Sequence, residues 1–150
     1  MAGARYVLQT EPTKGEPLSS NARVSMISIV IPLFNKASHI KDTIESVLAQ
    51  SYQNFELIIV NDGSTDNGPK IVREIKEPRI LVIDQANAGV SAARNRGIDA
   101  AKGDLIAFLD ADDLWNPDFL SAIMRLYQRF PWAGLYATAY RIVNTKNGVI

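Results

Sequence analysis

The feature that most constrains the fold of this sequence is a regular alternation of short apolar segments and amphipathic segments, which begins at residue 26. Four apolar segments are predicted to be buried strands: residues 27–32, 55–60, 79–83 and 104–109. Four predicted helices follow them in turn: residues 38–48, 69–76, 88–102 and 117–129. Strand–helix–strand units join through right-handed crossovers, so the sequence predicts an α/β fold whose mostly parallel sheet carries helices on both faces.

Local signals refine this outline. Ser38 is predicted to cap the first helix, and Pro117 lies in the first turn of the last one. One or two further strands are predicted within residues 132–143. Residues 1–25 are rich in Pro, Ser, Gly and charge without an apolar period, so we predict a flexible leader before a single domain at residues 26–150.

Composition argues against several functions. The chain has no cysteine and one histidine, His39, which excludes disulfides and thiolate metal sites and argues against a His-rich zinc site. Sixteen basic and sixteen acidic residues give no net charge, which argues against a nucleic-acid partner. No stretch approaches the roughly 20 apolar residues of a membrane span. These features favour a cytoplasmic protein, compatible with peripheral association at the inner face of a membrane.

Parallel sheets bind ligands at the carboxyl ends of their strands, and an acidic cluster follows the fourth predicted strand. Asp110, Asp112 and Asp113 place three carboxylates within four positions. Carboxylates packed this closely repel one another, and a hard divalent cation such as Mg²⁺ relieves the repulsion. The alternative is a solvated acidic turn before the helix near Pro117, and this segment alone leaves both interpretations open.

Three other segments lie at predicted strand ends or helix starts. Asp62 follows the second strand and can accept a hydrogen bond from a base or sugar, although Asp-Gly is also ordinary turn chemistry. Gly89 allows a close approach to a ligand, and Arg94 can contact a phosphate, unless its helix is an ordinary amphipathic one. Phe34, within the segment Pro32-Leu33-Phe34-Asn35, can stack on a base or belong to the core.

Together these segments, in this order, resemble the family 2 inverting glycosyltransferases of GT-A fold, which is a Rossmann-like fold. The resemblance spans about residues 26–117, and its blocks are residues 27–35, 46–52, 59–66, 87–97 and 108–115. Each block alone is a weak signal, whereas their order is specific. The usual dinucleotide-binding and phosphate-loop glycine motifs are absent from the sequence.

The resemblance implies a role for each matching residue. Pro32 and Phe34 would line the base pocket, and Asp62 would accept a hydrogen bond from the base, commonly uracil. Asn35 is expected to be a further substrate-binding residue. Gly89 and Arg94 would lie beside the donor, with Arg94 close to the base or diphosphate. Asp110 would face the ribose or sugar, Asp112 would bind Mg²⁺ or Mn²⁺, and Asp113 would cap a helix or support its neighbours. The family often has Asp where this chain has Asn61.

The implied reaction transfers a sugar from a nucleotide-diphosphate sugar, expected to be a UDP-sugar, to a saccharide or lipid-linked saccharide acceptor with inversion. The general base in the family is an Asp or Glu well downstream of the Asp110 segment, so we expect it beyond Ile150. The family is commonly associated with polysaccharide biosynthesis.

Two alternatives remain at this point. A haloacid-dehalogenase-type phosphatase also uses Asp-x-Asp and Mg²⁺, but that motif usually lies on the first strand and is followed by Thr or Val. A non-catalytic nucleotide-binding module would share every residue named above.

Overall fold

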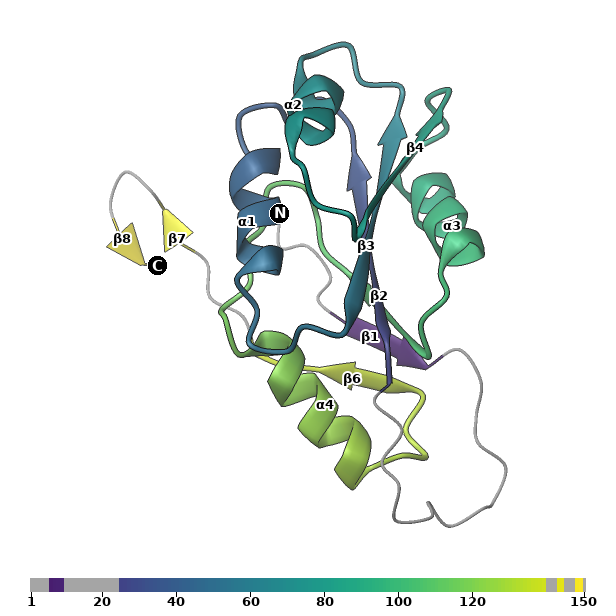
Figure 1. Cartoon of the computed structure of the whole chain (residues 1–150), viewed down its shortest axis with the longest axis vertical. Helices are drawn as coiled ribbons and strands as arrows, with labels where there is room; N and C mark the ends of the chain where they lie inside the picture. Colours follow the sequence, from purple (N-terminus) through teal and green to yellow (C-terminus); the bar gives the residue numbers. More distant parts are fainter. Residues whose placement is uncertain (1–5, 10–24, 140–142, 145–147, 150) are drawn as a thin grey trace.

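The computed structural model describes residues 6–9, 25–139, 143–144 and 148–149, and it gives side chains for residues 25–139. A six-stranded sheet has the order β4-β3-β2-β5-β1-β6, and β7 pairs with β8 separately (Figure 1). The strands are β1 Tyr6–Gln9, β2 Ile27–Leu33, β3 Phe55–Asp62, β4 Ile80–Gln85, β5 Leu105–Phe108, β6 Leu135–Ala137, β7 Val143–Asn144 and β8 Gly148–Val149. The helices are α1 Ile40–Leu48, α2 Gly68–Glu74, α3 Val90–Ala100 and α4 Phe119–Arg129.

The four strands predicted from apolar runs form the parallel part of the sheet. β2 pairs in parallel with both β3 and β5, and β3 pairs in parallel with β4. Nearly every residue of β2, β3 and β5 is buried, as expected for strands covered on both faces. β1 is antiparallel to β5 and to β6. The predicted α/β fold is confirmed.

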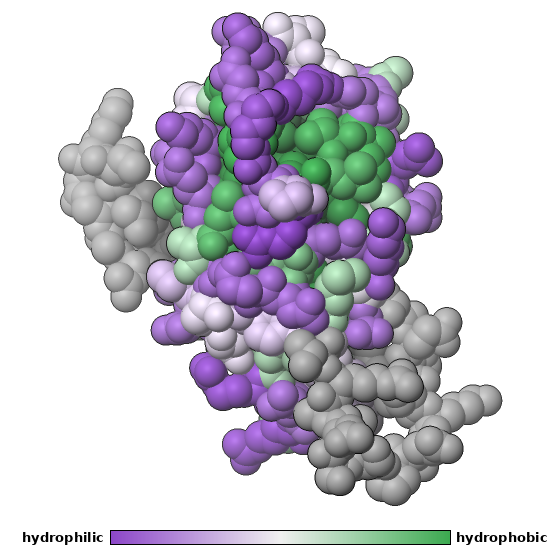
Figure 2. All heavy atoms as spheres, viewed as in Figure 1, coloured by the Kyte–Doolittle hydropathy of each residue, from purple (hydrophilic) through white to green (hydrophobic). Residues whose placement is uncertain are grey.

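Helices cover both faces of this sheet. In Figure 1, α3 lies on one side of the parallel strands and α1 and α2 lie on the other. Val30, Ile58, Val60 and Phe108 face α3, whereas the alternate residues of the same strands join a larger core with α1 and α4. β4 ends the sheet, and Leu81 on it is 42% exposed. Figure 2 shows hydrophobic side chains gathered at the level of β3 and β4 on a mostly hydrophilic face.

Several local predictions differ from the structure. Tyr6–Gln9 forms a strand, so the prediction of a flexible leader is wrong for these four residues; the rest of residues 1–24 lies outside the described part of the chain. α1 begins after His39, and Ser38 is not its cap. The position before α4 is Asp118, so Asp113 does not cap that helix. β6 provides one strand within residues 132–143, and β7 starts at Val143.

Within the described residues, none of the helices combines the length and apolar character that crossing a lipid bilayer requires.

Close packing of α3 on β2 depends on Gly97. A Cβ added there would lie 2.3 Å from Cγ1 of Val30, which is fully buried. We expect Gly97→Ala to destabilise the fold by about 1–2 kcal/mol, because overpacking outweighs the better helix propensity of alanine. Urea unfolding measures the change. Gly134→Ala is the control, since nothing lies within 4 Å of its added Cβ. Equal stability of the two variants would contradict this account of the packing.

Candidate functional site

The parallel strands bring their carboxyl ends to one edge of the sheet, where the predicted site residues lie. In the strand register Leu33 is opposite Asn61, Asn61 is opposite Asp84, and Asp62 is opposite Gln85. The loop that follows β5 begins beside the same edge, because β5 is the other neighbour of β2. The loops after four strands therefore converge at this edge, as the topology of parallel sheets requires.

The most enclosed polar group at this edge is the carboxylate of Asp62, which is 3% exposed. Its Oδ1 accepts hydrogen bonds from the amide of Ala88 and from Gln85 Nε2, and its Oδ2 accepts one from the amide of Gly89, all at 2.8 Å. Burial alone would raise the pKa of Asp62, but these three donors outweigh it and lower that pKa. Asp62 is therefore a fixed, ionised carboxylate.

Two glycines allow the loops around Asp62 to meet. Gly63 has φ of +70°, and an added Cβ would lie 2.9 Å from the amide nitrogen of Asn87. Gly89 has φ of +89°, with open space around an added Cβ, so its backbone conformation and not crowding requires glycine. That conformation directs the Gly89 amide to Asp62. The glycine predicted to approach a ligand thus holds a site carboxylate in place.

The segment after β2 contributes an exposed ring and a loop connection. Phe34 is 46% exposed, so it is not a core residue. Asn35 adopts φ of +52°, and its Oδ1 accepts hydrogen bonds from the amide (2.8 Å) and hydroxyl (3.3 Å) of Thr65. Asn35 therefore joins the loop after β2 to the loop after β3. Pro32, half-buried in β2, lies one residue before the end of the strand.

Asn61 has a clear electrostatic reason to be an amide. Its Nδ2 donates to Asp84 Oδ1 at 2.8 Å, and its Oδ1 accepts from the amide of Ser64 at 3.0 Å. Arg73 binds the other oxygen of Asp84. The Asn61 and Arg73 hydrogen bonds lower the pKa of Asp84 despite partial burial. An aspartate at position 61 would set two carboxylates against each other, because only an amide offers both donor and acceptor there.

The acidic cluster after β5 is divided between two basic side chains. Asp110 Oδ1 accepts from Arg94 Nη2 of α3 at 2.7 Å, and Asp112 Oδ2 accepts from Lys36 Nζ at 2.6 Å. The amide of Asp113 closes a turn onto the carbonyl of Asp110. The repulsion expected from the sequence is therefore relieved by two internal cations. Sequence reasoning missed Lys36; its place three residues after a strand that ends at this edge was the available signal.

Electrostatics at Asp112 follow from that pairing. Burial would raise its pKa, but the hydrogen bond and charge of Lys36, with a smaller effect of His39, lower it below the usual range. Asp112 and Lys36 are each 41% exposed at the side chain, so the pair is solvated. Arg94 and Asp110 are less exposed, and Arg94 Nε is enclosed without a hydrogen-bond partner among the described residues.

The loop that carries the acidic cluster is held by polar side chains of α1 and the residues just after it, a set of contacts that we term the α1 clamp. The contacts are Thr43 Oγ1 to the carbonyl of Ala111 (2.9 Å), the amide of Trp115 to Ser46 Oγ (3.2 Å), Gln50 Nε2 to the carbonyl of Asn116 (2.7 Å) and the amide of Leu120 to Gln50 Oε1 (3.0 Å). Gln50 is 2% exposed. Since both ends of its amide bind backbone groups, no apolar residue can replace it without cost.

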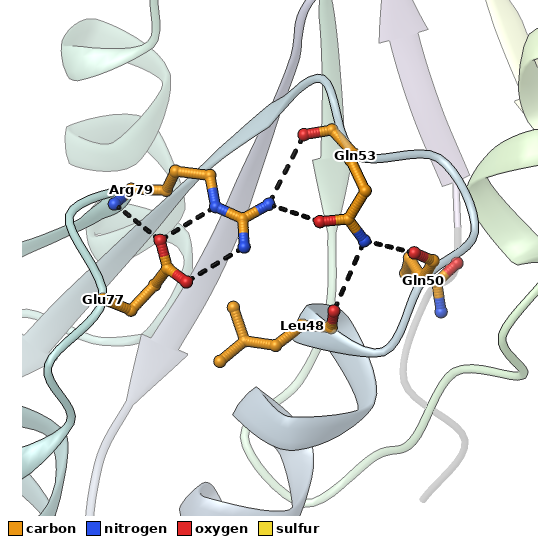
Figure 3. A network of polar contacts seen from close by, with 5 residues as sticks. All are labelled: Leu48, Gln50, Gln53, Glu77 and Arg79. Atoms are coloured by element: carbon orange, nitrogen blue, oxygen red, sulfur yellow. Dashed lines mark hydrogen bonds and ion pairs between the residues drawn. The ribbon is translucent and has the colours of Figure 1, made fainter.

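A second polar network ties the end of α1 to the start of β4 (Figure 3). Gln53 donates to the carbonyls of Leu48 and Gln50, and its Oε1 accepts from Arg79 Nη1 at 2.8 Å. Arg79 in turn forms an ion pair with Glu77, with Nε and Oε1 2.9 Å apart. Hydrogen bonds from Arg79 lower the pKa of Glu77 to about 2. This network lies away from the carboxyl ends of the strands and has a structural role.

Residues 28–147 match the family model described as glycosyl transferase family 2. The chain belongs to this family. It is 42% identical over 102 residues to the uncharacterized glycosyltransferase YibD of Escherichia coli, covering 67% of this chain and 30% of YibD. It is 38% identical over 101 residues to the glycosyltransferase GlyA of Streptococcus pneumoniae, covering 66% of this chain and 14% of GlyA. The chain thus spans about a third or less of the length of these curated relatives.

Solved structures of similar fold are GT-A glycosyltransferases, which confirms the predicted GT-A fold. S. aureus TarS, solved in complex with UDP, matches with a TM-score of 0.67 and 25% identity over 71% of this chain and 33% of that one. The mannosyltransferase PcManGT from Pyrobaculum calidifontis, solved with GDP-Man and Mn²⁺, matches with a TM-score of 0.64 and 25% identity over 67% of this chain and 32% of that one. These ligands belong to those proteins.

The α1 clamp predicts a specific loss of stability. We expect Gln50→Met to lower the free energy of unfolding by about 1–3 kcal/mol, because it leaves the buried amide of Leu120 without its acceptor and removes the side-chain donor to the carbonyl of Asn116. Urea unfolding followed by tryptophan fluorescence, to which buried Trp115 contributes, measures it. Gln128→Met, at an exposed position of α4, is the matched control. The explanation fails if both variants are equally stable.

The second network predicts a dependence on pH. The folded-state pKa of Glu77 is about 2 against an ordinary 4.5, so its carboxylate stabilises the fold above pH 4.5, and this contribution is lost as pH falls toward 2. The difference in urea midpoint between the unmutated chain and Glu77→Gln should therefore shrink across that window. Glu74→Gln, at an exposed position on α2, should show no such change. A difference that stays constant between pH 5 and pH 2 would contradict the pairing.

Proposed function

We propose that this chain binds the nucleotide sugar of a family 2 glycosyltransferase at the carboxyl edge of its sheet, with the nucleotide base at Asp62. The observation that carries the proposal is the buried, ionised carboxylate of Asp62, held by three donors at the point where parallel sheets take ligands. Structural relatives solved with UDP, UDP-GlcNAc and GDP-Man support a nucleotide-sugar ligand.

The geometry of Asp62 favours a uracil base. A carboxylate has about four acceptor positions, and three of those on Asp62 are used, two on Oδ1 and one on Oδ2. The remaining position on Oδ2 suits one donor, and uracil presents a single ring N–H. Guanine presents a ring N–H with an adjacent amino group, so it needs two acceptor positions where Asp62 has one left. The exposed ring of Phe34 provides a face on which the base can stack.

The diphosphate would lie toward Asp112, with a divalent cation. An exposed carboxylate suits Mg²⁺ or Mn²⁺. Among the described residues no three His, Cys, Asp or Glu side chains are grouped to hold a metal. Asp112 alone therefore supplies too few ligands for a metal ion. The diphosphate and water would complete the coordination, as is usual for Mg²⁺. When bound, the cation would neutralise charge on the departing diphosphate.

The other proposed roles follow from the pairs already described. Asp110, held by Arg94, would orient the ribose or sugar. Transfer with inversion to a saccharide hydroxyl needs a general base. The chain spans about a third or less of the length of its curated relatives, and we propose none of its described residues as that base. Family membership removes the support for a phosphatase.

Calorimetry with UDP in the presence of Mn²⁺ tests the donor site. We expect Asp62→Asn to weaken UDP binding by roughly tenfold or more, because it replaces a charged acceptor with a weaker one. Asp99→Asn, an exposed change on α3, should leave binding unaltered. Circular dichroism checks that both variants fold. The unmutated chain should bind UDP more tightly than GDP.

Absence of nucleotide binding by the unmutated chain would overturn the proposed function. If a folded Asp62→Asn variant binds UDP with unaltered affinity, the base does not bind at Asp62.

A further inference from the structure

Lys36 stands out because it neutralises the carboxylate that the proposed function assigns to the metal. Its Nζ lies 2.6 Å from Asp112 Oδ2, although the two residues are 76 positions apart in the sequence. Lys36 follows β2 and Asp112 follows β5, so the pairing of these neighbouring strands brings the two residues together. The contact is thus a product of the fold at the same edge that carries Asp62.

The two internal cations of the acidic loop differ in kind. Arg94 and Asp110 are 22% and 26% exposed, and the planar guanidinium is anchored on α3. Lys36 and Asp112 are each 41% exposed, and an ammonium on a flexible stem is readily displaced. An exposed ion pair changes an equilibrium constant by roughly two- to fivefold. The Lys36–Asp112 pair can therefore weaken the binding of a competing cation to Asp112 without preventing it.

We propose that Lys36 is an internal counter-cation that competes with the divalent metal for Asp112, and so couples metal binding to the arrival of the nucleoside diphosphate. This proposal rests on the proposed function. A protonated ammonium has no lone pair to share with a metal, and two cations at one carboxylate repel each other. Metal binding at Asp112 therefore requires Lys36 to withdraw from it.

The diphosphate changes that balance. Without it, an incoming cation gains one carboxylate and must displace Lys36. With it, phosphate oxygens supply further ligands to the cation, and their negative charge offers Lys36 another partner. The same carboxylate thus binds the metal weakly alone and more tightly with nucleotide. Since linkage is reciprocal, the metal must strengthen nucleotide binding by the same factor.

Electron paramagnetic resonance of free Mn²⁺, titrated with protein in the presence and absence of UDP, tests the proposal directly. We expect Lys36→Met to bind Mn²⁺ roughly two- to fivefold more tightly than the unmutated chain when UDP is absent. The enhancement of Mn²⁺ binding by UDP should be correspondingly smaller in the variant. Lys36→Arg should not show the tighter Mn²⁺ binding, because it keeps a cation at this position.

Two further variants make the result decisive. Lys41→Met removes an exposed lysine on α1 whose Nζ lies 3.8 Å from Glu45, and it should not alter Mn²⁺ binding. Lys36→Gln repeats the loss of charge with a polar side chain, so that a folding defect of Lys36→Met leaves the test intact. Circular dichroism establishes the folded state of each.

The proposal is overturned if, without UDP, the unmutated chain and the neutral Lys36 variants bind Mn²⁺ equally tightly. It is also overturned if none of them binds Mn²⁺ without UDP. A loss confined to UDP affinity would overturn it too, and would make Lys36 a phosphate-binding residue only. If UDP still enhances Mn²⁺ binding to the unmutated chain, these results contradict only the role of Lys36 and not the proposed function. If UDP neither binds nor enhances Mn²⁺ binding in the unmutated chain, the proposed function itself fails.

Discussion

The α1 clamp is the interaction on which the carboxyl edge of this sheet depends. Gln50 is buried, and its amide binds the carbonyl of Asn116 and the amide of Leu120, while Thr43 binds the carbonyl of Ala111. Without the clamp, the carbonyl of Ala111 and the amide of Leu120 would lose these partners beside the core, at a cost of about 1–3 kcal/mol each, and the carbonyl of Asn116 would keep the amide of Phe119. The clamp therefore fixes the backbone that presents Asp110 and Asp112.

At the carboxyl edge of the sheet, four carboxylates each have their own hydrogen-bond or ion-pair partners. Asp62 is matched by backbone amides and Gln85, Asp84 by Asn61 and Arg73, and Asp110 and Asp112 by Arg94 and Lys36. The pKa values of Asp62, Asp84 and Asp112 are accordingly lowered. Of the two cations that pair with the acidic loop, Lys36 is the more exposed and carries its charge on a flexible stem, so its pairing with Asp112 is the one that a ligand can rearrange more readily.

Hydrophobic periodicity predicted the four parallel strands and the four helices, but it predicted their first and last residues much less well. Residues 27–32 were predicted as a strand, and β2 is Ile27–Leu33, because a run of buried branched residues has few other solutions. Ser38 was predicted to cap α1 and does not, since capping depends on backbone angles that composition leaves open. β1 was missed because four residues in a polar segment carry too little periodicity, and their pairing with β5 is tertiary.

The sequence by itself determined the α/β alternation, the family and the positions of the polar segments at strand ends, because apolar spacing and local motifs are properties of neighbouring residues. Only the tertiary structure decided what those polar residues contact. It assigned the Gly89 amide to Asp62, joined Asn35 to Thr65, and set Lys36 on Asp112. Such pairs lie far apart along the chain, and the strand order that brings them within hydrogen-bonding distance is a consequence of packing the whole sheet.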